Sequence, residues 1–112
     1  MAWLDVEPCS GCWKDASTNL QYVSNLVSAL KTAGFHVGIY SSLGSWAAVT
    51  GSESATTDVI KSTQLWYAHY DGAPNFDDSE FYHFAGFSKP NIKQYNDNGS
   101  ACGLSYDKNW YP

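Results

Sequence analysis

Hydrophobic and polar residues alternate at the start of the chain and then recur with helical spacing. Trp3–Glu7 alternates with a period of two and ends at Pro8, which predicts a short strand. From about Ser17 to Ala33, hydrophobic residues recur every three or four positions, which predicts an amphipathic helix. Gly34 follows that segment and provides a normal helix stop.

The same patterns predict further strands along the chain. His36–Ser42 is rich in strand-forming residues, so strand, helix and strand make a βαβ unit with parallel strands and a right-handed crossover. The remaining expected segments are a short helix over Gly44–Val49, a polar loop over Gly51–Thr57, strands over Gln64–Tyr70, Asn91–Tyr95 and Leu104–Asn109, a mostly irregular stretch over Asp71–Pro90 and a turn over Asn96–Gly99.

These elements define one α/β unit with about five strands and two helices. The chain has 112 residues, about the size of one domain, and contains neither a linker nor an internal repeat. Two helices cannot cover five strands, and the first strand would leave a bare parallel edge. We therefore expect the chain to be the back portion of a larger domain.

Composition narrows the classes of function. Hydrophobic residues make up 44% of the chain and aromatic residues 16%, which favours a folded core over disorder. The net charge is −5, and all six basic residues are lysines, which argues against a protein that follows nucleic-acid phosphates. The longest hydrophobic runs have four residues, so no membrane span is expected. The first ten residues lack a signal-peptide pattern, which indicates an intracellular protein or a missing natural start.

Three cysteines leave two interpretations open. Cys9 and Cys12 form a C-x-x-C pair, which is found in zinc and redox sites. Zinc would need further ligands, and the candidates are Cys102, His36, His69 and His83. The favoured alternative is structural thiols or disulfides of an extracytoplasmic enzyme, with one partner outside this chain. An Asn98-Gly99-Ser100 glycosylation motif agrees with a secretory origin.

Asp5 and Glu7 are the most specific candidates for chemistry. Two residues apart on a strand, they share a face with Cα atoms roughly 6.5–7 Å apart. Two nearby carboxylates cannot both ionise freely, so one pKa should rise. A protonated acid beside an ionised one can cleave a glycosidic bond, and both lie at the carboxyl end of a strand, where parallel sheets place their sites. The alternatives are a solvated strand end or an acid pair that holds a divalent cation.

Aromatic residues and a third acid lie at other strand ends. Tyr40, Trp66 and Tyr70 could surround a saccharide, because their flat rings match the apolar faces of sugars. Each could equally be a core residue. Asp107 lies on the last strand, on the same face as Asn109, and could orient the Asp5 and Glu7 pair.

Several motifs together resemble glycoside hydrolase family 25, the Chalaropsis-type lysozymes, and most closely its fungal and protist members. In chain order they are WLDVEP, CSGCW, VGIYSS, LWYAHYD, KPNIKQY and YDKNWYP. The resemblance covers nearly the whole chain. It implies an irregular TIM-like (β/α) barrel, no metal or organic cofactor, and hydrolysis of β-1,4 bonds between N-acetylmuramic acid and N-acetylglucosamine in bacterial peptidoglycan.

The resemblance also implies roles for individual residues. Glu7 matches the general acid that protonates the leaving oxygen, and Asp5 matches the companion carboxylate that orients or stabilises the 2-acetamido group. Asp107 matches an acid that helps to position the substrate. The residues that match groove-lining positions are Tyr40, Trp66, Tyr70 and Gln94.

The departures from the family are large. Family members are nearly twice as long, and their opening strand carries a further aspartate that has no counterpart here. Residues 1–112 are therefore expected to form one partial catalytic domain that lacks its N-terminal strands and is inactive until the missing half completes it. The alternative is a non-catalytic carbohydrate-binding remnant. The expected partner is peptidoglycan, without nucleic acid or membrane, and the full-length parent is expected to be secreted or phagosomal and lysosomal.

Overall fold

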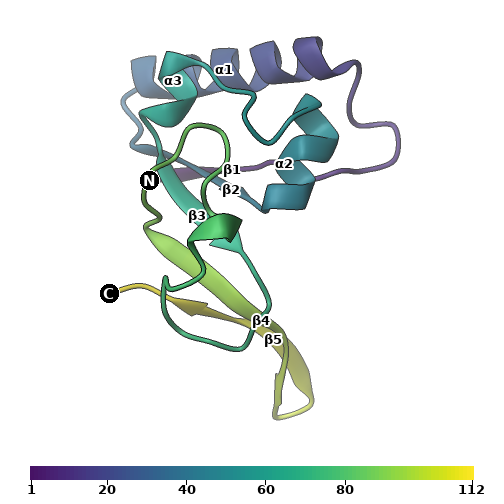
Figure 1. The fold of residues 1–112 in the computed structure, drawn as a ribbon, viewed down its shortest axis with the longest axis vertical. Helices are drawn as coiled ribbons and strands as arrows, with labels where there is room; N and C mark the ends of the chain where they lie inside the picture. The colour runs from purple at the N-terminus through teal and green to yellow at the C-terminus, as the bar shows by residue number, and fades with distance from the viewer.

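A computed structural model describes residues 1–112 as one five-stranded sheet with helices on one of its faces (Figure 1). The strands lie in sequence order; β1 to β4 are parallel and β5 is antiparallel to β4. The helices lie together at one end of the molecule, and the β4–β5 hairpin extends toward the other. The elements are β1 (Ala2–Asp5), α1 (Ala16–Thr32), β2 (Val37–Ser41), α2 (Leu43–Thr50), α3 (Asp58–Lys61), β3 (Gln64–Ala68), the 3-10 turn η1 (Ser79–Phe81), β4 (Ile92–Ala101) and β5 (Leu104–Trp110).

The two faces of the curled sheet have different roles. The helix-covered face carries the hydrophobic core, in which Ile39 of β2 and Leu65 of β3 pack with Val27 of α1 and Trp46 of α2. We call the opposite face the inner face. It is formed by alternate residues of the five strands, namely Trp3, Asp5, Tyr40, Trp66, Gln94, Asp107 and Asn109. The inner face therefore collects residues from both ends of the chain.

Local signals define the long helix α1. The Asp15 carboxylate accepts a hydrogen bond from the backbone N–H of Thr18 and caps the first turn. Hydrogen bonds from Thr18 and Ser17 lower the pKa of Asp15 to about 2. Gly34 adopts a φ of 93° just beyond the helix, a conformation that glycine tolerates best. The helix then buries Val23 and Val27 against the sheet, as its hydrophobic spacing predicts.

The structure confirms the α/β class and the parallel βαβ unit, with two differences. Three α-helices are present instead of two, because the Thr57 side chain caps the short helix α3, which is too short to produce a periodic pattern. Strand β1 ends at Asp5 rather than at Glu7, so Glu7 lies just beyond the ladder. The stretch Asp71–Pro90 is mostly irregular, as expected, apart from the 3-10 turn η1.

The turn predicted over Asn96–Gly99 is wrong, because those residues belong to β4. The hairpin closes instead at Cys102 and Gly103, whose φ angles of 53° and 76° suit a two-residue turn. Gly99 serves a different purpose: the Tyr106 ring from β5 packs against its backbone, and a Cβ there would overlap that ring. The register of the β4–β5 pair shifts on both sides of Asn96, so the turn-like residues accompany irregular pairing within a strand.

Two of the three cysteines pair within the chain. Cys9 and Cys12 form a disulfide, and Cys102 is a free, exposed thiol. The zinc interpretation fails for this pair, because neither sulfur is a thiolate that could ligate a metal. The expectation of structural disulfides is confirmed for Cys9 and Cys12, whereas a partner outside the chain remains a prediction for Cys102.

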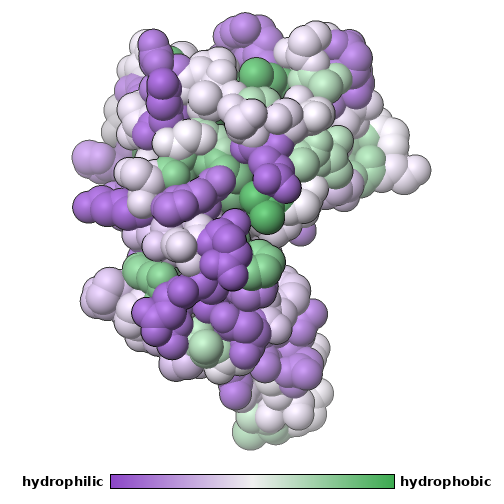
Figure 2. Space-filling view, viewed as in Figure 1, coloured by the Kyte–Doolittle hydropathy of each residue, from purple (hydrophilic) through white to green (hydrophobic).

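The surface is mixed. Figure 2 shows separate hydrophobic patches among hydrophilic side chains on one face of the molecule. None of the helices has the length and hydrophobicity needed to cross a membrane.

Gly38 in β2 lets the inner face pack closely. The Trp3 ring lies directly over Gly38, where a Cβ would overlap it, and Trp3 also meets Trp66 edge-on with ring centroids 5.7 Å apart. Gly38→Ala is expected to lower the free energy of unfolding by about 1–3 kcal/mol, because Trp3 must move. Urea unfolding of this variant measures the loss. Gly44→Ala in α2 is the matched control, since that site is open and alanine favours helix; equal stability of both variants would contradict the prediction.

Candidate functional site

Glu7 and Asp5 lie on the same side of the chain at the end of β1. Val6 between them is buried in the core, so its two neighbours face away from the helices. Two hydrogen bonds hold this point: the Val6 N–H donates to the Tyr40 carbonyl at 2.9 Å, and the Ser41 hydroxyl donates to the Val6 carbonyl at 2.7 Å. Both carboxyl groups remain accessible to solvent. The structure thus brings the two acids together at the carboxyl end of the strand.

The surroundings of Glu7 favour its protonated form. Partial burial raises the pKa of Glu7, and a hydrogen bond to Asp5 and the nearby Asp5 charge raise it further. Glu7 is therefore the member of the pair that keeps a proton more readily than an ordinary glutamate. Burial, the Tyr70 hydroxyl and the two carboxylates also raise the pKa of Tyr40, so its hydroxyl stays protonated and can donate.

Gln94 of β4 joins the other predicted residues. Its side-chain carbonyl accepts hydrogen bonds from the hydroxyls of Tyr40, at 2.6 Å, and Tyr70, at 2.8 Å. Its amide group donates to the carboxylate of Asp107 on β5 at 2.9 Å. Gln94 is buried, so this arrangement orients both tyrosines and the third acid from one side chain. Four residues predicted from sequence therefore form one hydrogen-bonded group on the inner face.

Trp66 of β3 lies on the same inner face, between Tyr40 and Trp3 of β1. Its ring lies 4.9 Å from the Tyr40 ring, centroid to centroid, in an edge-on contact. Its indole N–H donates to the side-chain carbonyl of Asn109 on β5 at 2.8 Å. Trp66 is thus held by polar and aromatic contacts on the inner face rather than in the helix-covered core.

A hollow of about 410 Å³ opens beside Glu7. Of the predicted residues, Glu7, Tyr40 and Tyr70 line it, whereas Asp5, Trp66, Gln94 and Asp107 lie beyond its lining. The other lining residues are Ser42, Leu43, Gly44, Ser45, Ala68, His69 and Phe81. The His69 and Phe81 rings stack with centroids 3.5 Å apart and form one wall. The hollow therefore offers a carboxyl group, hydroxyls and flat rings to a ligand.

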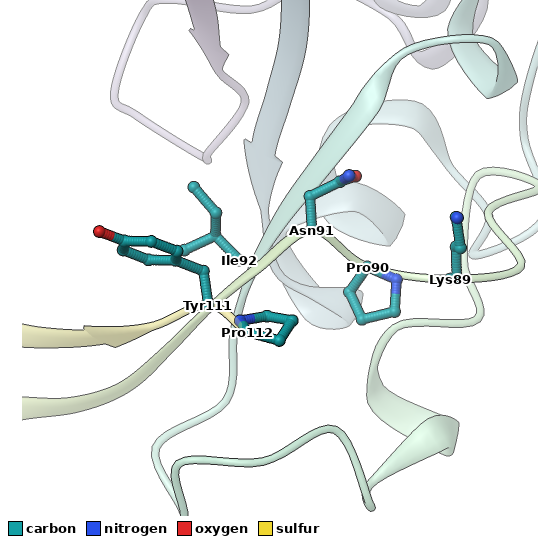
Figure 3. A pocket seen from close by; sticks show the side chains of 6 residues that line it. All are labelled: Lys89, Pro90, Asn91, Ile92, Tyr111 and Pro112. Carbon is teal, nitrogen blue, oxygen red and sulfur yellow. The ribbon is translucent and has the colours of Figure 1, made fainter.

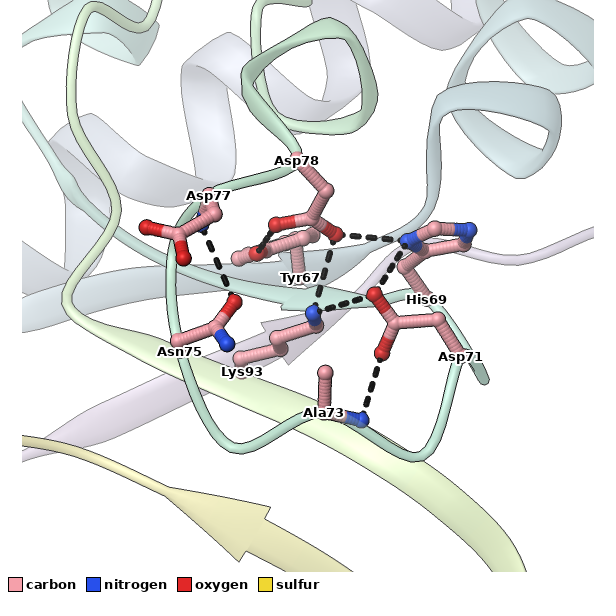
Figure 4. A network of polar contacts seen from close by, with 8 residues as sticks. All are labelled: Tyr67, His69, Asp71, Ala73, Asn75, Asp77, Asp78 and Lys93. Carbon is pink, nitrogen blue, oxygen red and sulfur yellow. Dashed lines mark hydrogen bonds and ion pairs between the residues drawn. The ribbon is translucent and has the colours of Figure 1, made fainter.

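A buried ionic network, shown in Figure 4, supports that wall. The side chain of Lys93 on β4 is fully buried, and its ammonium lies 2.8 Å from Asp71 Oδ2 and 3.0 Å from Asp78 Oδ2. Asp78 also accepts a hydrogen bond from the Tyr67 hydroxyl at 2.6 Å and contacts His69 Nδ1. The network ties the irregular segment after β3 to the sheet, and thereby sets the positions of His69 and Phe81.

Hydrogen bonds stabilise the ionised form of both aspartates in this network. Burial by itself would raise the pKa values of Asp71 and Asp78, but hydrogen bonds outweigh it and lower both pKa values. Lys93 and the backbone N–H of Ala73 donate to Asp71, and Tyr67, His69 and Lys93 contact Asp78. His69, Asp71 and Asp78 are close enough to hold a metal ion. The Lys93 ammonium, however, contacts the carboxylate oxygens that such an ion would need, so these residues do not fit a metal site.

A second hollow of about 420 Å³ lies away from these groups (Figure 3). It is lined by Lys89, Pro90, Asn91, Ile92, Tyr111 and Pro112, at the start of β4 and the end of the chain. Its lining contains no predicted site residue and no acidic side chain. The hollow beside Glu7 is therefore the better candidate site.

Sequence reasoning missed the supporting residues of the site. His69 was considered only as a metal ligand, although it follows β3 directly and precedes Tyr70. Lys93 neighbours Gln94 on a strand, so the alternation of a strand sends it to the opposite face. A lysine on the core-facing side needs carboxylate partners, and that requirement was the available signal for Asp71 and Asp78.

Comparisons with known proteins identify lysozyme-like relatives. A family model described as "Lysozyme-like protein 1" matches residues 1–95. Among relatives from Dictyostelium discoideum, "Counting factor 45-1" is 44% identical over 99% of this chain and 36% of its own length, and "Probable GH family 25 lysozyme 2" is 43% identical over 100% of this chain and 50% of its own. "Lysozyme-like protein 5" of Caenorhabditis elegans is 36% identical over 98% of this chain and 49% of its own length. No solved structure gives a significant match.

The protein is lysozyme-like and belongs to a glycoside hydrolase family, because the family model covers most of the chain. The paired acids at the end of β1 are compatible with that class. The chain belongs to the lysozyme-like proteins of glycoside hydrolase family 25. It spans half or less of the length of the curated relatives described above.

Proposed function

We propose that these residues belong to an N-acetylmuramidase that cleaves β-1,4 bonds between N-acetylmuramic acid and N-acetylglucosamine in bacterial peptidoglycan. The observation that carries the proposal is the pair at the end of β1: Glu7, whose pKa is raised, beside Asp5 and open to a hollow that Tyr40 and Tyr70 line. A proton donor beside an ionised carboxylate is the arrangement that glycoside hydrolysis requires.

In the proposed mechanism, Glu7 gives its proton to the leaving glycosidic oxygen. Asp5 orients the 2-acetamido group of the sugar. The carbonyl oxygen of that acetamido group attacks the anomeric carbon, and Asp5 stabilises the positive charge that then develops. Water then adds to the same carbon, the bond to the acetamido oxygen breaks, and the water returns a proton to Glu7. Asp107 acts through Gln94, which holds the hydroxyls of Tyr40 and Tyr70 against the substrate.

The proposal extends to the whole protein. Relatives are about two to three times as long, and the sheet has an open edge at β1, so we propose that further strands complete a TIM-like (β/α) barrel and the second wall of the groove. Turnover then depends on that completed domain. Peptidoglycan is the proposed partner, and a secreted, phagosomal or lysosomal location is where the protein would meet it.

Clearing of a Gram-positive cell-wall suspension tests the proposal. The 112-residue chain is compared with a protein in which a longer family member's preceding strands are joined to Met1. The extended protein is expected to clear the suspension and the shorter chain to clear it much more slowly. Failure of the extended protein to clear, although it is folded by circular dichroism, would overturn the enzyme proposal.

Activity is expected to be highest at mildly acidic pH. Glu7 must carry a proton to act as the acid, and its pKa lies above the usual glutamate value. The rate should therefore fall as pH rises through that raised pKa, because the donor is lost. A profile of kcat against pH measures this descending limb. A rate that climbs steadily into the alkaline range would exclude Glu7 as the proton donor.

A second candidate function is carbohydrate binding without catalysis. The observation in its favour is that tyrosines and the stacked His69 and Phe81 rings line the hollow, since flat rings can bind a sugar without an acid. Sedimentation with insoluble peptidoglycan distinguishes the two: binding by an extended protein that never clears the wall supports the second function.

A further inference from the structure

The segment between Glu7 and α1 folds back toward Glu7. The disulfide between Cys9 and Cys12 closes a tight loop directly after Pro8. The next residue, Trp13, then donates its indole N–H to the main-chain carbonyl of Glu7 at 2.6 Å. The indole therefore contacts the chain six positions earlier, at the residue proposed as the proton donor.

Asn19 of α1 anchors the other end of this segment. Its side chain is buried, and its carbonyl accepts the backbone N–H of Lys14 at 2.8 Å. Its amide donates to the carbonyls of Lys14, at 3.0 Å, and Val49 of α2, at 2.9 Å. Because Lys14 follows Trp13 directly, these bonds hold the main chain beside Trp13 against α1 and α2. The main chain at Trp13 thus lies between the disulfide and this anchor.

Glu7 has few other restraints. The ladder between β1 and β2 ends at Asp5, and the last sheet-like contacts are those of Val6 with Tyr40 and Ser41. Beyond Val6, the contact that holds the main chain of Glu7 comes from Trp13. A misplacement of about 1 Å in a reacting group can lower the rate about a hundredfold. The hydrogen bond to the Glu7 carbonyl therefore matters for the position of the Glu7 carboxyl group.

We propose that Trp13 is a positioning residue for Glu7: its indole N–H, held by the Cys9–Cys12 disulfide and by Asn19, fixes the main chain at Glu7 so that the carboxyl lies beside Asp5. The expected effect on kcat rests on the proposed function. The structural link between Trp13 and Glu7 stands independently of any activity.

The first test compares Trp13→Phe with Trp110→Phe in the extended protein. The two changes remove the same atoms, but Trp110 lies on the last strand, where its ring meets Phe76, away from Glu7. Trp13→Phe is expected to lower kcat about 10-fold or more with KM changed less than twofold, and to move the alkaline limb of the pH profile to lower pH. Trp110→Phe should leave kcat and the limb unchanged. Equal kcat values for Trp13→Phe and the parent protein would overturn the proposal.

The second test requires no activity. The Glu7 carboxyl of the 112-residue chain is titrated by 13C NMR in the parent, in Trp13→Phe and in the double variant Cys9→Ser, Cys12→Ser. Both variants should move the Glu7 titration midpoint toward an ordinary glutamate value, since the carboxyl leaves Asp5. An unchanged midpoint in both folded variants overturns the inference. A shifted midpoint supports the positioning role whether or not the protein is active. If the extended protein also fails to cleave peptidoglycan, the proposed function is wrong and the positioning role stands.

Discussion

Replacing Glu7 with glutamine in the extended, wall-clearing protein is expected to lower kcat at least about 100-fold, while binding to insoluble peptidoglycan is retained. Glutamine keeps the size and polarity of the side chain but has no proton to give to the glycosidic oxygen. The hollow beside Glu7 is otherwise unchanged, since Tyr40 and Tyr70 are held by Gln94 and not by Glu7. Turnover of a soluble peptidoglycan fragment measures the rate, and sedimentation measures the binding.

The matched control for this experiment is Glu53→Gln. Glu53 is exposed in the loop after α2 and lies outside the hollow, so the same chemical change there should leave kcat within twofold. If Glu7→Gln retained the parent rate, the proton donor would have to be another group. Loss of binding together with activity would instead assign Glu7 to substrate binding.

Replacing Lys93 with methionine is expected to lower the free energy of unfolding by about 1–3 kcal/mol, because it leaves two partly buried carboxylates without their cation. Methionine fills nearly the same volume, so the loss reports on charge rather than on a cavity. The Asp71 and Asp78 oxygens that now contact the ammonium would face each other instead. Chemical unfolding at neutral pH measures the change.

Two comparisons make this result specific to the buried network. Lys61→Met removes an exposed ion pair with Asp58 and should cost less than about 1 kcal/mol. Adding Asp71→Asn and Asp78→Asn to Lys93→Met should recover part of the loss, because the uncompensated charges are gone. A Lys93→Met variant as stable as Lys61→Met would show that the network does not support the fold.

The candidate site was largely predictable because strands place side chains with a period of two. Alternation alone puts Asp5 and Glu7 on one face, and the structure has them there, with Val6 buried between them. The hydrogen bonds through Gln94 were not predictable, because they join residues that are 13 to 54 positions apart in sequence. Register across the sheet, which no local pattern contains, decides those contacts.

The misplaced turn has a similar cause. Asn96 to Gly99 have the composition of a turn, yet the partner strand β5 pairs with them and the Tyr106 ring needs the space at Gly99. A cross-strand contact therefore overrode local propensity. Glycine was required there for close packing rather than for a positive φ.

By itself, the sequence determined the first strand and the long helix, the parallel βαβ unit, the exclusion of a membrane-spanning helix and the shared face of Asp5 and Glu7, because these follow from periodicity over a few neighbouring residues. Only the tertiary structure decided that Cys9 pairs with Cys12, that Trp13 returns to Glu7, and that Lys93 lies buried between Asp71 and Asp78. Such contacts depend on where the chain goes in space after it leaves each element, and burial sets how strongly the charges act on one another.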